Sequence, residues 1–287
     1  MKLVNDFTEY EILDLNSGHK LESWNGIILS RPDPQVIWQK EETPIWQKAV
    51  AIYDRSHTGG GKWEIKKAIP NSWIINYKDL KFNLKLMGFK HTGLFPEQAY
   101  NWNLIKEKIK QANREIKVLN LFAYTGGATV AALSAGASVV HVDSSRGMVD
   151  WAKENVKLNH LEDKPVRFLV DDVRKFVKRE IRRNNKYDII IMDPPSFGRG
   201  AKSEVWNIEK DLDQLIQDTA LLLSDQPLLF LINSYTTGLS KTVLENLLYL
   251  RINQRFPGKI SSDELGLPVK DSSLILPCGI YARWEAK

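Results

Sequence analysis

The sequence has one cysteine, few histidines and no long apolar run, and each shortage excludes a class of protein. Cys278 alone gives neither an internal disulfide nor a redox pair, and the five scattered histidines lack metal-ligand spacing. No run approaches the roughly 18 apolar residues of a membrane helix. The N-terminus MKLVNDFTEYE also lacks the apolar core of a signal peptide. We therefore expect a cytoplasmic protein with no metal and no membrane partner.

The sequence also lacks a large excess of charge of either sign. The chain has 40 basic and 35 acidic residues, a net charge of +5. This balance indicates a polyanionic partner, but the excess is too small to predict nucleic acid binding by itself. With 287 residues, 43% of them hydrophobic, the chain can bury a sizeable core in one large domain or two.

The first 90 residues are typical of a small β-rich unit. They contain short strands broken by turns, among them YEILDLNSG, NGIILSRPDP and SWIINY. The stretch KWEIKKAIPNSW interleaves basic and aromatic residues, which could bind nucleic acid. Tryptophans that form the core of the unit's own sheet are the favoured explanation, because aromatic side chains contribute so much to core burial.

After residue 90 the sequence pattern changes to predicted strands that alternate with predicted helices, which indicates an α/β domain over residues 91–287. Five apolar runs read as strands of a parallel sheet: KVLNLFA, SVVHVD, RFLV, YDIIIMD and PLLFLIN. Amphipathic stretches such as RGMVDWAKENVKLNHL lie between them. Two more strands, KISSDELGLPV and GIYARWE, end the chain.

Glycines and carboxylates follow these strands, where ligands bind in an open parallel sheet. Gly126 and Gly127 follow the first strand, Asp143 the second, Asp171-Asp172 the third and Asp193 the fourth. A glycine turn with an acid ending the next strand fits the ribose of any nucleoside cofactor, NAD included. The G-x-G-x-x-G spacing and the P-loop are absent, which favours a cofactor without phosphates, such as S-adenosylmethionine.

Each of these residues also has a purely structural explanation. Asp143 and Asp172 could cap the helices that follow them, and the glycines could form only a tight turn. Carboxylates at three successive strand ends favour a shared site.

The stretch IIIMDPPSFGRG suggests a methyl-transfer site. Transfer of a methyl group from a sulfonium to an amino nitrogen is an in-line displacement, so the enzyme mainly positions the reactants. Pro194 and Pro195 remove two backbone donors, so that carbonyls here can face a substrate N–H. Asp193 can accept a hydrogen bond or set the loop, and Phe197 offers a face on which a flipped base can stack.

Several of these motifs together resemble a known family. NLFAYTGG, HVDSS, WAKENVKLN, LVDD and especially DPPSFGRG are similar to class I S-adenosylmethionine-dependent methyltransferases, within them to the bacterial large-subunit ribosomal RNA methyltransferase group. Upstream, RPDPQVIW, GGGKWE and FKHTGLFPEQAYNW resemble a subgroup with a β-rich N-terminal extension. The resemblance implies a Rossmann-like seven-stranded sheet whose last strand is antiparallel.

The resemblance also implies roles for individual residues. The loop from Phe122 to Gly126 would surround the methionine part of the cofactor, Asp143 would hold its ribose and Asp172 would meet its adenine. The full set of expected cofactor residues is Gln98, Phe122, Tyr124, Thr125, Gly126, Asp143, Ser144 and Asp172. For Gln98, a polar turn before the next helix is an adequate alternative. The expected catalytic residues are Asp193, Pro194, Pro195 and Phe197.

One departure from the family bears on the reaction. Relatives that methylate cytosine C5 use a thiolate, whereas this chain has Asn233-Ser234-Tyr235 in the loop after the fifth strand and Ser196 after the prolines. Cys278 would reach the site only from the start of an antiparallel last strand, and a small buried residue is the favoured explanation. We therefore expect N-methylation of a base in ribosomal or other RNA. The alternatives are methylation of a protein amide nitrogen and a catalytically silent cofactor-binding protein that interacts with RNA.

Basic residues suggest two places for RNA contact outside the loop itself. The helix predicted over 173–186 carries seven of them, although such a run is usually a solvated face. Arg199 and Lys202, beside the proline loop, are better placed for a substrate phosphate.

Overall fold

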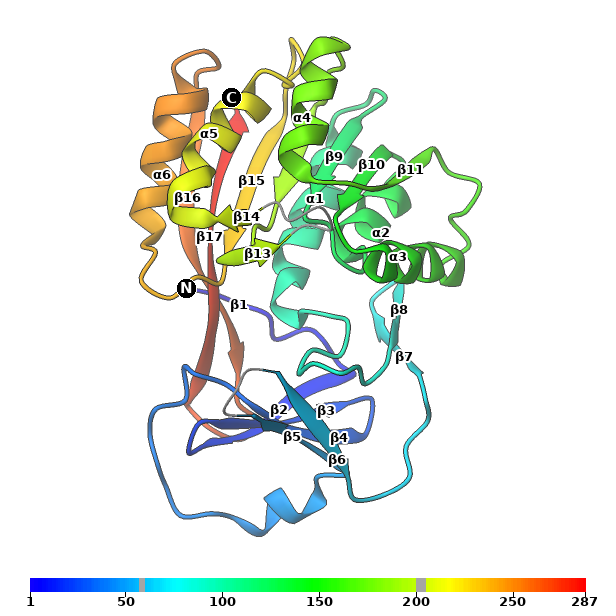
Figure 1. Ribbon diagram of the computed structural model, residues 1–287, viewed down its shortest axis with the longest axis vertical. Helices are drawn as coiled ribbons and strands as arrows, with labels where there is room; N and C mark the ends of the chain where they lie inside the picture. The colour runs from blue at the N-terminus through cyan, green and yellow to red at the C-terminus, as the bar shows by residue number, and fades with distance from the viewer. Residues whose placement is uncertain (57–59, 200–204) are drawn as a thin grey trace. The chain divides into compact units, whose positions relative to one another are not determined.

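The chain folds into two compact units (Figure 1). The computed structural model describes residues 1–56, 60–199 and 205–287, without the side chain of Arg199. Unit 1 consists of Met1–Tyr100 and Leu265–Cys278, and unit 2 of Asn101–Glu264 and Gly279–Lys287. Residues 265–278, which follow most of unit 2 in the sequence, therefore belong to unit 1.

Unit 1 is β-rich, as the alternating pattern predicts. Its five-stranded sheet has the order β2-β3-β4-β5-β6, and β7 and β8 form a separate hairpin. Two-residue turns at Ser17-Gly18 and Asn25-Gly26, all with positive φ, join the first three strands of this sheet. The elements are β1 (Lys2–Leu3), β2 (Tyr10–Asn16), β3 (His19–Trp24), β4 (Ile27–Pro32), η1 (Pro44–Lys48), β5 (Ala51–Arg55), β6 (Gly61–Ile65), β7 (Trp73–Tyr77), β8 (Leu80–Leu84) and η2 (Pro96–Gln98).

The core of unit 1 is aromatic and aliphatic. Trp24, Leu15, Leu21 and Phe82 are completely buried. Of the two tryptophans in KWEIKKAIPNSW, Trp73 is buried and Trp63 is partly exposed. Core packing therefore accounts for Trp73 but only partly for Trp63.

Unit 2 contains the predicted parallel sheet. In the order β15-β12-β9-β10-β11 all neighbours are parallel, and β17 pairs antiparallel with β15 (Figure 1). With β16 this gives the seven expected strands, and β1 adds a short eighth by pairing with Leu265 and Gly266 of β16. The elements are α1 (Ala99–Gln111), β9 (Lys117–Leu121), α2 (Gly127–Ser134), β10 (Ser138–Asp143), α3 (Arg146–Leu158), β11 (Val166–Val170), α4 (Val173–Arg182), β12 (Ile189–Met192), β13 (Phe197–Arg199), β14 (Val205–Asn207), α5 (Ile208–Ala220), β15 (Leu229–Ser234), α6 (Lys241–Leu248), η3 (Tyr249–Asn253), β16 (Gly258–Pro268) and β17 (Ile275–Ala286).

Helices cover both faces of this sheet, which is why β12 and β15 are buried along their whole length and why β12 and the first four residues of β15 are apolar. One core joins alternate residues of β9, β12 and β15 to α4, α5 and α6. On the opposite face, Asn120 of β9 and His141 of β10 both contact Thr129 of α2. The carboxyl ends of the parallel strands thus lie between two packed layers.

Helix α4 shows how the basic run is accommodated. Its buried residues, Val173, Phe176, Val177 and Glu180, recur at helical spacing, and the basic residues fall on the other face. Several of these are paired within the protein: Arg174 with Asp172 and Asp211, Arg179 with Asp171 and Arg183 with Glu180. A largely solvated, partly ion-paired face accounts for the run without RNA.

The described part of the chain has no helix long and apolar enough to cross a membrane. Within the same residues, no cluster of three or more His, Cys, Asp or Glu side chains is arranged to hold a metal ion.

Candidate active site

The residues predicted from the strand ends converge at one edge of the unit 2 sheet. Strands β9, β10, β11 and β12 are parallel, so the segments that follow them leave the sheet on the same side. Phe122, Asp143, Asp171 and Asp193 each stand at or directly after the end of one of these strands. The sequence-based grouping of the loop and the carboxylates is therefore a real spatial cluster.

The loop after β9 has an unusual backbone. Phe122, Tyr124 and Gly126 have φ values of 55°, 51° and 85°, so every second residue is left-handed. Two of the three carry side chains, a conformation that persists only where its surroundings fix it. One anchor is Asn155 of α3, which is completely buried and donates from Nδ2 to the carbonyl of Thr125 at 2.9 Å.

The two glycines allow this loop to pack closely against protein. A Cβ on Gly126 would lie 3.0 Å from the Cβ of Ala152, and one on Gly127 would lie 2.9 Å from Cζ2 of Trp102. Sequence analysis expected the glycines to admit a ligand, with a tight turn as the alternative. The structure supplies a packing reason for both, while their approach to a ligand stays a prediction.

Asp143 organises the loop electrostatically. Its Oδ2 accepts from the backbone N–H of Tyr124 at 2.9 Å, and its Oδ1 accepts from that of Ser145 at 2.8 Å. It is not the cap of α3, since the Ser145 side chain takes that role. Burial raises the pKa of Asp143, and hydrogen bonds from Ser145, Tyr124 and Ser144 oppose that rise. The two carboxylate oxygens have about four acceptor sites between them, more than these backbone donors use, so the carboxylate can still accept from a ribose hydroxyl.

A buried polar chain lies beneath the loop. Asn120 Nδ2 donates to Thr129 Oγ1 at 3.0 Å, and Thr129 Oγ1 lies 2.9 Å from His141 Nδ1. The Thr129 hydroxyl has one donor and two acceptor sites, so it can bond Asn120 and His141 at the same time. Burial lowers the pKa of His141 to about 3, partly offset by a hydrogen bond with the Tyr124 backbone. The ring is therefore neutral at physiological pH.

Asp172 has the structural role that sequence analysis offered as its alternative. It is the N-cap of α4 and accepts from the backbone N–H of Lys175 at 3.0 Å. Its other oxygen lies 3.6 Å from an Arg174 nitrogen. Contact with an adenine stays a prediction. Ser144 is exposed beside Asp143, where a contact with the cofactor is likewise a prediction.

The Asp-Pro-Pro loop is held more tightly than its sequence predicts. Trp206 Nε1 donates to the Pro195 carbonyl at 2.6 Å, and the backbone N–H of Ile208 donates to the Ser196 carbonyl at 3.1 Å. Phe197 then pairs with Asn207 in the small β13–β14 ladder. We expected that carbonyls in this stretch could face a substrate N–H without forming a ladder. The carbonyls of Pro195 and Ser196 each accept one bond within the protein, and a contact between this loop and a substrate stays a prediction.

Exposure separates the members of this loop. Pro194 is buried and Asp193 is partly buried, whereas the Phe197 side chain is 54% exposed. A large aromatic ring left in water on a strand that is anchored elsewhere is well suited to stack on an incoming planar group.

Trp206 is the site residue that sequence reasoning missed. It is 6% exposed, its ring centroid lies 5.2 Å from that of Phe122, and the Arg174 guanidinium lies 5.9 Å from its ring. Through Pro195 and Phe122 it joins the Asp-Pro-Pro loop to the loop after β9. A signal did exist: a tryptophan directly before Asn207, the N-cap of α5, is placed to pack on its neighbours as the helix begins.

Other predicted residues lie outside this cluster or outside the described residues. Gln98 is buried in η2 of unit 1, and its approach to a cofactor stays a prediction. Cys278 also belongs to unit 1, and burial, then Glu97, raises the pKa of its thiol well above the usual value. A catalytic thiolate needs the opposite shift. Lys202 and the side chain of Arg199 are not among the described residues.

The open, mostly parallel sheet with loops and carboxylates at its strand ends is an α/β fold of the kind that binds ligands at that edge. Comparisons with known proteins agree with this fold. Residues 54–247 match the family model of S-adenosylmethionine-dependent methyltransferases. The chain therefore belongs to that family, and S-adenosylmethionine is its cofactor.

Individual relatives extend the comparison. The crystal structure of the SAM-dependent methyltransferase from Agrobacterium tumefaciens is 34% identical, covers 99% of this chain and 93% of its own, and superposes with a TM-score of 0.94. Ribosomal RNA large subunit methyltransferase K/L of Pseudoalteromonas atlantica is 39% identical over half of this chain. Ribosomal RNA large subunit methyltransferase K of Neisseria meningitidis is 29% identical over 70% of this chain. The chain spans only 20% of the first of these and 52% of the second.

Proposed function

We propose that this methyltransferase N-methylates a base in RNA, with ribosomal RNA the favoured substrate. The observation that carries the proposal is the Asp-Pro-Pro-Ser-Phe loop, which is bonded to Trp206 through Pro195 and presents an exposed Phe197 ring. The relatives named as ribosomal RNA large subunit methyltransferases support the RNA class. We further propose that the enzyme acts in the cytoplasm, where such an RNA is available.

The cofactor would be held at the strand ends of unit 2. We assign its ribose to Asp143, its methionine part to the loop from Phe122 to Gly126, and its adenine to the neighbourhood of Asp172, with Ser144 and Gln98 as further contacts. The donor set fits a nucleoside that carries a diol and no phosphates, since Asp143 offers two carboxylate oxygens and the loop offers backbone groups. When bound, S-adenosylmethionine supplies a methyl group on a sulfonium.

The chain's own residues would then position the acceptor amine. Since the carbonyls of Pro195 and Ser196 are engaged, we assign the substrate N–H to the carbonyl of Pro194, with Asp193 fixing the start of the loop. Phe197 would stack on the base and hold its amine in line with the methyl group. An amine nucleophile requires no thiolate, which suits a chain whose single cysteine has a raised pKa.

Label transfer tests the proposal. The purified protein is incubated with methyl-labelled S-adenosylmethionine and with RNA or protein fractions from cells lacking the gene, whose targets are unmodified. The proposal expects label in RNA and little in the same fractions from wild-type cells. Label in protein alone would replace it with protein methylation, and cofactor binding without label in any fraction or assembly intermediate would favour a silent binding protein.

A further inference from the structure

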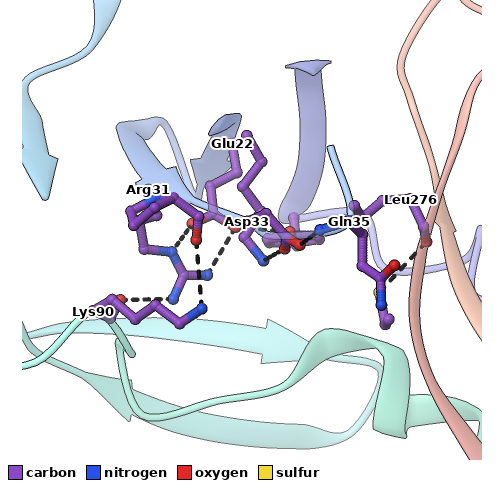
Figure 2. A network of polar contacts seen from close by, with 10 residues as sticks. Glu22, Arg31, Asp33, Gln35, Lys90 and Leu276 are labelled. Atoms are coloured by element: carbon purple, nitrogen blue, oxygen red, sulfur yellow. Dashed lines mark hydrogen bonds and ion pairs between the residues drawn. The ribbon is translucent and has the colours of Figure 1, made fainter. Parts of the chain in front are cut away.

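Unit 1 contains a polar network that the methyl-transfer site does not use (Figure 2). At its centre Arg31, only 4% exposed, forms a bidentate ion pair with the completely buried Glu22, and Tyr10 donates to the same carboxylate at 2.8 Å. The guanidinium also donates from Nη1 to the carbonyl of Lys90 at 2.9 Å. This inner pair is neutral overall and its groups are satisfied.

A second layer of charge surrounds that pair. Lys20 is the cross-strand neighbour of Arg31, and its ammonium lies 3.2 Å from Asp33. Lys90 approaches from the segment after β8, and its Nζ donates to the carbonyl of Pro32 at 3.4 Å, a long hydrogen bond (Figure 2). Among the residues that the structure describes, no carboxylate lies within ion-pair distance of the Lys90 ammonium.

The surroundings of Lys90 are unfavourable for a cation. Burial, followed by the charges of Lys20, Arg31 and Arg55, lowers its pKa, and only Asp33 opposes them. A partly buried ammonium among like charges reduces stability unless a ligand compensates it. The ligand that such a centre lacks is an anion.

Aromatic residues precede and follow Lys90 in the sequence, and their rings contact one another. The His91 ring centroid lies 6.3 Å from that of Phe89 and 5.1 Å from that of Phe95, and all three residues are partly exposed. Burial and the neighbouring cations lower the pKa of His91 to about 3, so its ring is neutral. Trp63 donates from Nε1 to the carbonyl of Phe89 at 3.3 Å, which ties this segment to β6.

Cations interleaved with partly exposed aromatic rings suit single-stranded nucleic acid, whose phosphates bind the former while its bases stack on the latter. We propose that Lys20, Lys90 and Arg55, with the rings of Phe89 and His91, form a contact surface for single-stranded RNA in which Lys90 binds a phosphodiester oxygen. This inference rests on the proposed RNA substrate and adds a second point of contact to it.

Fluorescence anisotropy with a labelled oligouridylate, measured on the full chain without cofactor, tests the inference separately from catalysis. Lys90→Gln should weaken binding about fivefold to tenfold near 0.1 M salt and flatten the logarithmic salt dependence by about 0.7, as expected for one lost phosphate contact. Lys90→Arg should retain most of the affinity. Lys2→Gln, the same charge change at an exposed lysine of unit 1, should have little effect.

Thermal unfolding of the same variants separates binding from folding. Because Lys90 is repelled by its neighbours, Lys90→Gln should leave the Tm unchanged or raise it. A lower Tm with unchanged RNA affinity would assign Lys90 a structural role and overturn the inference, as would equal losses of affinity in Lys90→Gln and Lys2→Gln. If oligouridylate binds through Lys90 but no RNA fraction accepts label, the proposed catalytic function fails while the contact surface stands.

Discussion

Replacing Gly126 by alanine tests whether the close packing of the loop after β9 shapes the cofactor site. Gly126 has φ of 85°, and a left-handed alanine costs roughly 1–2 kcal/mol. The new methyl group would also lie 3.0 Å from the Cβ and 3.4 Å from the Cα of Ala152, both on the buried side of α3. Overpacking of this kind adds about 1–3 kcal/mol. The sum is on the order of 2–5 kcal/mol unless the loop moves, and a moved loop should lose cofactor affinity.

Gly136 provides a matched control. It has φ of 97°, but a Cβ there would meet no atom within 4 Å among the described residues. Gly136→Ala should therefore lose only the backbone term and retain normal cofactor affinity. Urea unfolding and calorimetric titration with S-adenosylmethionine, run on both variants, give the comparison. Equal destabilisation of the two variants, or a Gly126→Ala protein that binds cofactor normally, would refute the packing argument.

Three further predictions concern the same edge of the sheet. Asp143→Ala should weaken S-adenosylmethionine binding by about tenfold or more, since charge-assisted hydrogen bonds to the ribose are lost; unchanged affinity in calorimetry would remove Asp143 from the site. Trp206→Phe keeps an aromatic neighbour for Phe122 but loses the hydrogen bond to Pro195. We expect kcat to fall roughly fivefold, about 1 kcal/mol, with cofactor affinity unchanged. A fivefold fall in cofactor affinity would contradict the assignment of Trp206 to the Asp-Pro-Pro loop and not to the cofactor. The pKa of His141 falls from 6.5 unfolded to about 3 folded, so its contribution to stability is complete above about pH 6.5 and decreases as the pH falls toward 3. Between pH 7.5 and 5 the wild type should therefore lose on the order of 2 kcal/mol more than His141→Asn in urea unfolding, and equal losses would mean that His141 titrates normally.

Local sequence patterns predicted most of the unit 2 sheet. Strand β12 and the first four residues of β15 are apolar because helices cover both faces of the sheet, and the acids that follow parallel strands had to meet at one edge. Asp143 could be located in this way because its position depends only on where β10 ends. The pattern also predicted the last two strands, and the family resemblance supplied the antiparallel orientation of β17, which its pairing with β15 confirms.

The contacts that tighten the site depend on partners distant in sequence, and local patterns do not reveal these. The bond from Trp206 to Pro195 joins residues eleven positions apart, and Asn155 reaches Thr125 from α3, thirty positions along the chain. The sequence also does not predict that residues 265–278 belong to unit 1, since the pattern of β16 and β17 is that of ordinary strands throughout. Local sequence patterns around Lys90 do not reveal its electrostatic environment, because that environment forms only when β3, β4 and the segment after β8 come together.

Nucleoside analysis of ribosomal RNA tests the central claim most directly. RNA from cells lacking the gene is digested and compared by mass spectrometry with RNA from the same cells supplied with the wild-type gene or with the Phe197→Ala variant. Our account predicts that one N-methylated nucleoside is depleted in the deletion strain, restored by the wild type and restored poorly by the variant. Identical nucleoside profiles in all strains, with label transferred only to protein in vitro, would contradict it.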